Sequence, residues 1–281
     1  MFSYEGTPGF FAQDDPQADP SEIGAVPAGF GLLDVSEDRW KTFFSKLREL
    51  NAANDGASYK LILFGRHGQG YHNVAEDKYG TEAWDDYWSK LNGDGELTWG
   101  PDPELTDLGK TQASAANEVW KAERTAQIPF PRKLYCSPMT RALQTYLVTF
   151  DGVIMSNDGG SKTPVILEEC REQYGEHTCD KRSTLSHIRT AFPQFAVEEG
   201  FSEEDKLWEA DVRESPAHVA ERAKRVLDRI FSGEDEDAMF ISVTAHSGLI
   251  NGFLRAIGRE RYVLPTGGVL PVVVKATRVS V

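Results

Sequence analysis

The sequence predicts an α/β fold, a three-layer α/β/α sandwich around a mostly parallel central sheet, and two observations support this. Short apolar runs, as expected of strands buried on both faces, alternate along the chain with amphipathic segments of helical period. This alternation is typical of a parallel sheet with helices on both faces. No second core or internal repeat is evident, so residues 1–281 are expected to form a single domain.

The first 35 residues are predicted to form an extended N-terminal arm, because they contain many Pro, Gly and Asp residues and show little periodicity. Four apolar residues are expected to pack this arm against the core: Phe10, Phe11, Phe30 and Leu33.

The elements after the arm follow from periodicity and capping residues. Buried strands are predicted at residues 60–65, 133–137, 164–169 and 239–245. Helices are predicted at residues 36–50, 80–91, 105–123, 138–150, 216–232 and 246–258. Thr106 is expected to cap one of these helices, and Pro138 and Pro216 are expected in the first turns of two others. A last strand is predicted at 269–279, toward an edge of the sheet, because Pro271 cannot donate to a strand ladder.

The remaining segments are predicted to be irregular. Residues 66–74 begin at the mouth of the first buried strand and are expected to form a polar loop, and residues 92–104 form another. Residues 151–215 are polar and are expected to form an insertion over the active site.

Composition limits the possible partners. The formal net charge is −14, so nucleic acid and anionic membranes are poor candidates, since both need a basic surface. There is no run of about 18 apolar residues, and the N-terminus does not resemble a signal peptide. Cys136, Cys170 and Cys179 are not spaced as zinc ligands, and a reduced, cytoplasmic protein is the simplest expectation.

Reactive side chains follow the ends of the predicted strands. In chain order they are Arg66 and His67; Ser137 and Arg141; Glu168, Glu169 and Glu172; and His246. In parallel sheets, ligands bind beyond the carboxyl ends of the strands, so these side chains are expected to meet at one rim. Two arginines and two histidines suit a tetrahedral oxyanion, because guanidinium groups match its geometry.

This arrangement makes His67 a candidate nucleophile on phosphorus. One ring nitrogen would attack, while the other would hold the ring by donating to a nearby backbone carbonyl. Arg66, Arg141 and His246 would share the charge of the phosphoryl oxygens. A carboxyl group would then protonate the leaving oxygen, because a carboxyl among anionic oxygens has a raised pKa and retains its proton.

Five motifs carry a resemblance to a known family. In order they are GRHGQGYHN, ELTDLGKTQA, YCSPMTRALQT, LEECREQYGEHTCDKRS and VTAHSG. The chain, from about residue 60 to 257, resembles the histidine phosphatase superfamily, and within it the phosphoglycerate-mutase-like phosphatases of fungi. The resemblance implies that His67 is phosphorylated, that Arg66, Arg141 and His246 form the phosphate pocket, and that Asn73 stands at its edge.

The resemblance also implies an acid in the glutamate-rich segment after the third strand. This acid is assigned to Glu172 of CREQYG, and Glu169 is the alternative. Arg182 of HTCDKRS is expected to line the substrate pocket as a second anion contact. No metal or cofactor is expected.

Three functions follow from these expectations. The first is a metal-independent phosphatase acting on a small phosphate monoester through a phosphohistidine. The second is a phosphomutase that returns the phosphoryl group to another hydroxyl. The third is a non-catalytic protein that binds phosphorylated ligands.

Overall fold

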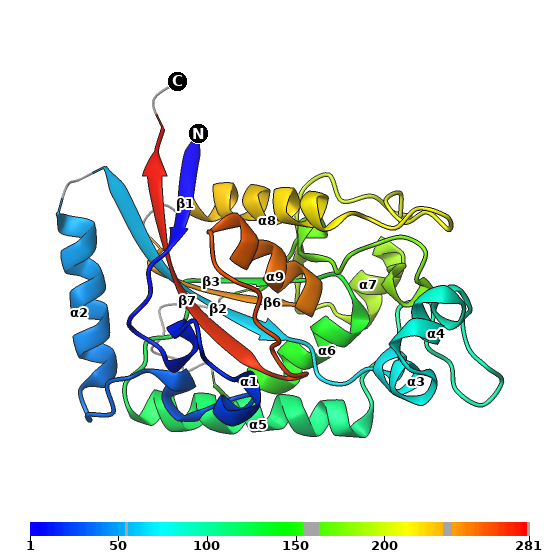
Figure 1. Ribbon diagram of the computed structural model, residues 1–281, viewed down its shortest axis with the longest axis horizontal. Helices are drawn as coiled ribbons and strands as arrows, with labels where there is room; N and C mark the ends of the chain where they lie inside the picture. The colour runs from blue at the N-terminus through cyan, green and yellow to red at the C-terminus, as the bar shows by residue number, and fades with distance from the viewer. Residues whose placement is uncertain (54–55, 154–162, 233–237, 280–281) are drawn as a thin grey trace.

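A seven-stranded sheet forms the centre of the computed structural model, which describes residues 1–53, 56–153, 163–232 and 238–279 (Figure 1). In spatial order the strands are β1 (Phe2–Gly6), β7 (Val269–Arg278), β2 (Ala57–Arg66), β6 (Phe240–Ala245), β3 (Lys133–Cys136), β4 (Val165–Ile166) and β5 (Ala196–Val197). Strands β2, β6, β3, β4 and β5 are parallel, whereas β7 runs antiparallel to both β1 and β2. The predicted mixed α/β fold with a mostly parallel sheet is confirmed.

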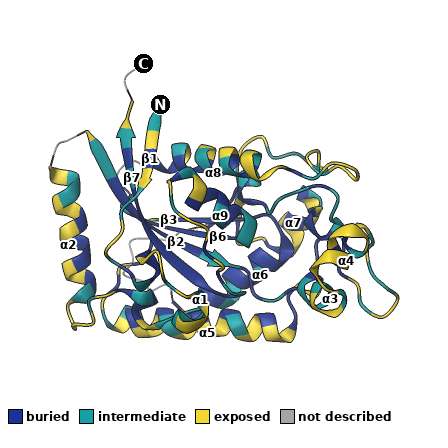
Figure 2. Ribbon diagram, viewed as in Figure 1, coloured by how far each residue is buried: buried dark blue, intermediate teal, exposed yellow. Residues whose placement is uncertain are grey.

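Helices cover both faces of the sheet (Figure 1). One face carries α2 (Arg39–Ala52), α5 (Asp107–Thr125) and α6 (Thr140–Thr149), and the other carries α8 (Pro216–Phe231) and α9 (Ser247–Ala256). The helices on each face pack against the strands and form a separate apolar cluster with them. The strands are buried, and the outer faces of the helices are exposed (Figure 2). Capping follows the predictions at two helices: Thr106 Oγ1 accepts the Gly109 N–H at 3.0 Å, and Pro216 opens α8. Pro138, expected in the first turn of α6, instead precedes that helix, whose N-cap is Met139.

The remaining helices and turns are short. They are α1 (Pro20–Ile23), α3 (Tyr71–Tyr79), α4 (Thr81–Asp86), α7 (Leu185–Ala191) and the 3-10 turns η1 (Ala12–Asp14), η2 (Ala28–Gly31), η3 (Trp88–Lys90), η4 (Glu168–Cys170) and η5 (Thr178–Asp180). Two predictions need correction. The helix predicted over 80–91 is broken at Tyr87, which has non-helical φ and ψ of −135° and −58°. The polar loop predicted after β2 becomes α3 at Tyr71, where Asn73 Oδ1 accepts the Gly70 N–H at 3.0 Å.

The position of β7 agrees with the prediction of a strand toward an edge of the sheet, although β1 and not β7 is the edge strand. β7 lies between β1 and β2, and its Pro271 pairs with Leu63 of β2. The Val269 N–H donates to the Ala25 carbonyl and the Val273 carbonyl accepts the Thr7 N–H, both on the side of β7 away from β2. Because backbone groups alternate between the two sides of a strand, the Pro271 nitrogen also faces away from β2. β1 pairs with β7 only as far as Val274, so the proline interrupts no ladder there. A proline therefore fits an interior strand where the neighbouring strand is short.

The N-terminal arm contributes more structure than predicted. Its first residues form the edge strand β1. Phe11 and Phe30 are buried in the same apolar cluster as residues of α2 and α5. Leu33, expected to pack inward, is 59% exposed, and its neighbour Leu32 is buried in its place. Residues 154–162, part of the predicted insertion over 151–215, lie outside the described residues. Within the described ranges, no helix is both long enough and apolar enough to cross a membrane.

Candidate active site

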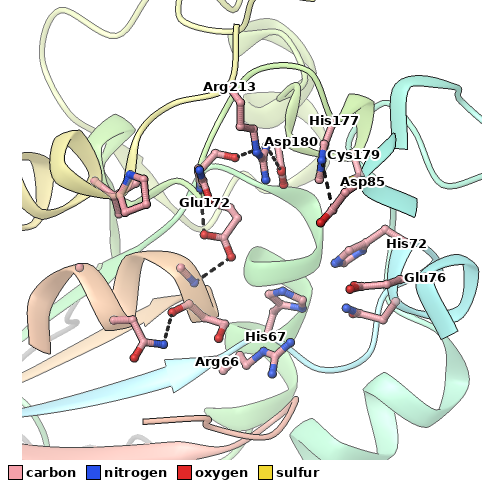
Figure 3. Close-up of a pocket in the computed structure, with 18 of the residues that line it drawn as sticks. Arg66, His67, His72, Glu76, Asp85, Glu172, His177, Cys179, Asp180 and Arg213 are labelled. Atoms are coloured by element: carbon pink, nitrogen blue, oxygen red, sulfur yellow. Dashed lines mark hydrogen bonds and ion pairs between the residues drawn. The ribbon is translucent and has the colours of Figure 1, made fainter. Parts of the chain in front are cut away.

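A cavity of about 710 Å³ lies at the carboxyl ends of the central parallel strands, where such sheets usually bind ligands (Figure 3). Its walls come from the end of β2, from α3, α4, α6 and the start of α8, from residues 172–180 and Arg213, and from α9 with the segment after it. Exposed side chains, including Thr81, Asp85 and Arg255, stand at its rim, so the cavity opens to solvent.

His67 lies at this cavity immediately after β2, and its ring has a defined orientation. Nδ1–H donates to the carbonyl oxygen of Gly68 at 2.7 Å, as the sequence predicted for a nucleophilic imidazole. Burial, followed by the positive charges of Arg141 and Arg66, lowers the pKa of His67 well below its ordinary value of 6.5. The ring is therefore neutral at neutral pH, with a lone pair on Nε2.

Two glycines bring helix α5 against the loop that carries His67. A Cβ at Gly68 would lie 2.2 Å from the Gly109 carbonyl oxygen, and a Cβ at Gly109 would lie 2.1 Å from that of Gln69. The Gly68 N–H also donates to Thr145 Oγ1 of α6 at 3.0 Å. Only glycines allow this close backbone approach, which holds the carbonyl that orients His67.

Arg66 and Arg141 line the same cavity, and each has a buried Nε that could donate a hydrogen bond to a ligand. Arg66 donates to the Leu264 carbonyl at 2.7 Å, and Arg141 donates to the Cys179 carbonyl and to Asp180, both at 2.8 Å. The Nε of each arginine is buried and has no hydrogen-bond partner among the described residues. Buried donors normally find acceptors, so an anion in this cavity would complete both arginines.

Two more imidazoles pack around His67. The His246 ring centroid lies 5.0 Å from that of His67, and the His72 centroid lies 5.3 Å from it. Burial first, then the charge of Arg141, lowers the pKa of both rings well below 6.5. His246 is fully buried, and His72 is buried and lines the cavity.

Glu172, the predicted acid, lines the cavity opposite the α3 wall (Figure 3). Its Oε1 accepts the Gln173 N–H at 2.9 Å, and its Oε2 accepts the Gly248 N–H at 3.1 Å in the first turn of α9. Glu169, the alternative acid, does not line the cavity; its carboxylate pairs with Arg225 at 2.9 Å and 3.0 Å. The structure therefore brings Glu172, and not Glu169, to the cavity that contains His67.

Arg222 of α8 holds the segment that carries Glu172. Its buried guanidinium donates to the carbonyl oxygens of Glu169, Arg171 and Glu172 at 2.8, 3.0 and 3.1 Å. The same group makes two hydrogen bonds of 2.6 Å with the carboxylate of Glu214. Because this buried guanidinium has a carboxylate partner, it can hold the backbone carbonyls of residues 169, 171 and 172 in place.

Arg182 does not take the place predicted for it. Its guanidinium is buried away from the cavity, where Nε donates to both oxygens of Glu168 at 3.0 Å. Its remaining donors bond to Ser183, Ser202 and neighbouring backbone carbonyls. The side chain therefore ties together segments behind the site, and the expectation that it lines the substrate pocket is corrected.

Two residues that line the cavity, Asp180 and Arg213, were not predicted from the sequence. Asp180 is buried and accepts from Arg141 and from Arg213, both at 2.8 Å. Arg213 also donates to the carbonyl oxygens of Gln173 and Gly175 at 2.6 and 2.8 Å. Both residues lie in irregular segments with no periodic pattern, so only the folded chain brings them together.

Helix α3 also supplies residues to the cavity. Asn73 lines it, as predicted, and Glu76 follows one turn later (Figure 3). Burial raises the pKa of Glu76 above its ordinary value. Asn73 was predicted and Glu76 was not; their spacing of three residues, which places them on one helix face, was the signal that could have indicated Glu76.

One group near the cavity has potential metal ligands. Single ligand atoms of His177, Cys179 and Asp180 lie within 4.8 Å of one another. However, Asp180 already pairs with Arg141 and Arg213, and two guanidinium charges beside a carboxylate oppose the binding of a cation.

The mixed α/β fold places a neutral, buried imidazole and two arginines at one cavity. Residues 62–262 match the model of the histidine phosphatase superfamily (branch 1). The chain belongs to this superfamily, and its curated relatives include fungal phosphoglycerate-mutase-like proteins.

Two relatives and one solved structure illustrate this similarity. A probable phosphoglycerate mutase of Arthroderma benhamiae is 41% identical over 97% of this chain and 84% of its own length. A probable phosphoglycerate mutase of Saccharomyces cerevisiae is 35% identical over 97% of this chain and 96% of its own length. A solved mycobacterial glucosyl-3-phosphoglycerate phosphatase is 22% identical, with a TM-score of 0.41, over 70% of this chain and 81% of that chain.

Proposed function

We propose that this protein is a metal-independent phosphatase that hydrolyses a small phosphate monoester through a phosphohistidine on Nε2 of His67. The observation that carries this proposal is the state of that ring. It is neutral, it is held through Nδ1–H by the Gly68 carbonyl, and it lines the same cavity as Arg66 and Arg141, whose buried Nε atoms have no partner among the described residues.

The first step forms the phosphohistidine. The Nε2 lone pair of His67 attacks phosphorus, the bond from phosphorus to the ester oxygen breaks, and the carboxyl group of Glu172 gives its proton to that oxygen. Arg66, Arg141 and His246 stabilise the charge on the transferring oxygens, because they are fixed in position before the reaction.

The second step releases phosphate. The carboxylate of Glu172 accepts a proton from a water molecule as its oxygen attacks phosphorus, and the bond from phosphorus to His67 Nε2 breaks. The open rim supports hydrolysis, because water can enter once the alcohol has left. The substrate is proposed to be a small molecule, because the cavity of about 710 Å³ is of the size that usually holds one.

A phosphomutase is the second candidate, and the names of the fungal relatives favour it. A mutase would retain the departing product and return the phosphoryl group to another of its hydroxyls. It would also need a bisphosphate primer to keep the histidine phosphorylated.

One experiment separates these candidates. The protein would be incubated with sugar, polyol and acid phosphates, without a primer, and followed by phosphorus NMR. The proposal predicts free phosphate from at least one ester. Isomerised ester without free phosphate would favour the mutase, and binding of inorganic phosphate without turnover of any ester would favour a non-catalytic binding protein.

A further inference from the structure

We propose that Ser137 is a positioning residue, whose hydroxyl donates to Nε2 of His246 and thereby keeps the proton of that imidazole on Nδ1. The inference rests on the proposed function, because it assigns the Nδ1–H of His246 as a donor to an oxygen of the phosphoryl group. Ser137 itself makes no contact with the substrate in this proposal.

The contact between the two side chains is short and fully buried. Ser137 Oγ lies 2.7 Å from His246 Nε2, and both residues are 0% exposed. Strand pairing sets this distance, because the Ser137 N–H donates to the Thr244 carbonyl at 2.9 Å where β3 ends beside β6. His246 follows two residues after Thr244, so the ends of two adjacent strands bring the hydroxyl and the ring together.

The available partners determine which atom carries the proton. Ser137 Oγ already accepts the Met139 N–H at 3.2 Å, so the oxygen has a donor and its own proton needs an acceptor. Among the described residues, the acceptor within reach is Nε2 of His246. An Nε2 that accepts carries no proton, and a neutral imidazole then carries its proton on Nδ1.

The Nδ1 atom of His246 is buried and has no partner among the described residues. It belongs to the ring that packs beside the proposed nucleophile, His67. A buried donor without an acceptor is costly, and an anionic oxygen at the site would remove that cost. The other tautomer would present a lone pair to the same oxygen and repel it.

The direct test is the tautomer of His246. Two-bond proton–nitrogen correlation spectra of protein labelled with ¹⁵N-histidine distinguish Nδ1–H from Nε2–H, and the His246→Asn variant assigns the signals. Wild-type protein is expected to show the Nδ1–H form of His246 at neutral pH, and inorganic phosphate is expected to shift that signal.

The Ser137→Ala variant is expected to give a mixture of both tautomers. Its affinity for inorganic phosphate and its kcat/KM are expected to fall roughly tenfold to a hundredfold, somewhat less than the ~10²–10³-fold cost of deleting such a donor outright. Ser89→Ala is the matched control, because Ser89 is also fully buried but its hydroxyl has no partner in the described structure. That control is expected to leave the tautomer and the activity unchanged.

Two results would overturn the inference. They are an Nε2–H tautomer in the wild type, or an unchanged Nδ1–H tautomer in Ser137→Ala. If activity also falls in that variant while its tautomer is unchanged, Ser137 has only a structural role. If the wild-type protein cleaves no ester at all, the proposed function fails, while the spectra with inorganic phosphate still decide the tautomer.

Discussion

The carboxylate of Glu172 occupies the space beside Gly248 that a larger residue would need. A Cβ on Gly248 would lie 2.1 Å from Glu172 Oε1, and the Gly248 N–H donates to Oε2 at 3.1 Å. The first turn of α9 therefore both leaves room for this carboxylate and bonds to it. A positively polarised helix N-terminus also stabilises the carboxylate that remains after proton transfer.

This relationship gives a test of the acid. Glu172→Gln is expected to lose much of the ~10²–10⁴-fold contribution of general acid catalysis on alkyl phosphates, whose leaving oxygen needs a proton. The loss on nitrophenyl phosphate should be small, because that leaving group departs as a stable anion. Comparing kcat/KM on the two esters provides the measurement.

Glu169→Gln is the matched control, because Glu169 pairs with Arg225 outside the cavity. A loss that depends on the leaving group at Glu169, with equal losses on both esters at Glu172, would transfer the role of acid to Glu169. Gly248→Ala should resemble Glu172→Gln, since the flexible end of Glu172 must move while the backbone stays in place.

Replacement of His67 should abolish turnover and preserve the fold. We expect His67→Ala to reduce kcat by roughly 10³-fold or more, because no neighbouring group replaces the nucleophile. Phosphate release measures the loss, and circular dichroism checks folding. His187→Ala, at an exposed position on α7, serves as the control. Normal turnover by folded His67→Ala would exclude the covalent mechanism.

Acidification should destabilise the folded protein before its carboxylates titrate. The pKa values of His67, His72 and His246 are all lowered well below 6.5 by burial. Below pH 6.5 the unfolded chain therefore binds more protons than the folded chain, and the free energy of unfolding falls as pH falls. Each such group contributes up to about 1.4 kcal/mol per pH unit.

Urea unfolding at a series of pH values measures this slope. His246→Asn should make the slope shallower, because one buried imidazole is removed. An unfolding free energy that stays constant between pH 6.5 and the ordinary aspartate pKa of 3.8 would contradict the neutral, buried state of these rings.

Activity should persist in excess EDTA. The charges that stabilise the phosphoryl oxygens come from Arg66 and Arg141, and Asp180 of the potential ligand group is already paired with two guanidinium groups. Phosphate release would be measured before and after dialysis against the chelator. A loss of activity that a divalent cation restores would count against a metal-independent reaction.

Periodicity and motif order were sufficient to predict the layers of the fold and the strand ends at which the site lies. Arg66 ends β2, His67 follows it and Arg141 follows β3, all at positions that parallel topology brings to one rim. The interior place of β7 was not predictable in the same way, because it depends on how far the unrecognised strand β1 extends.

The errors within the site have a common cause. Asp180 and Arg213 lie in segments whose path is set by tertiary contacts, so the convergence of Arg141 and Arg213 on Asp180 leaves no periodic signal. Arg182 lies in the same segment as Asp180, and the motif alone did not indicate which of these side chains faces the cavity.

The most direct test of the account is the covalent state of His67. The protein would be mixed with a cleavable phosphate ester, quenched in base, digested, and the peptide containing His67 examined by mass spectrometry. The covalent mechanism predicts a phosphoryl group on Nε2 of His67, present in Glu172→Gln and absent in His67→Ala. Release of phosphate from the ester with no phosphorylated His67 at any time after mixing would contradict it.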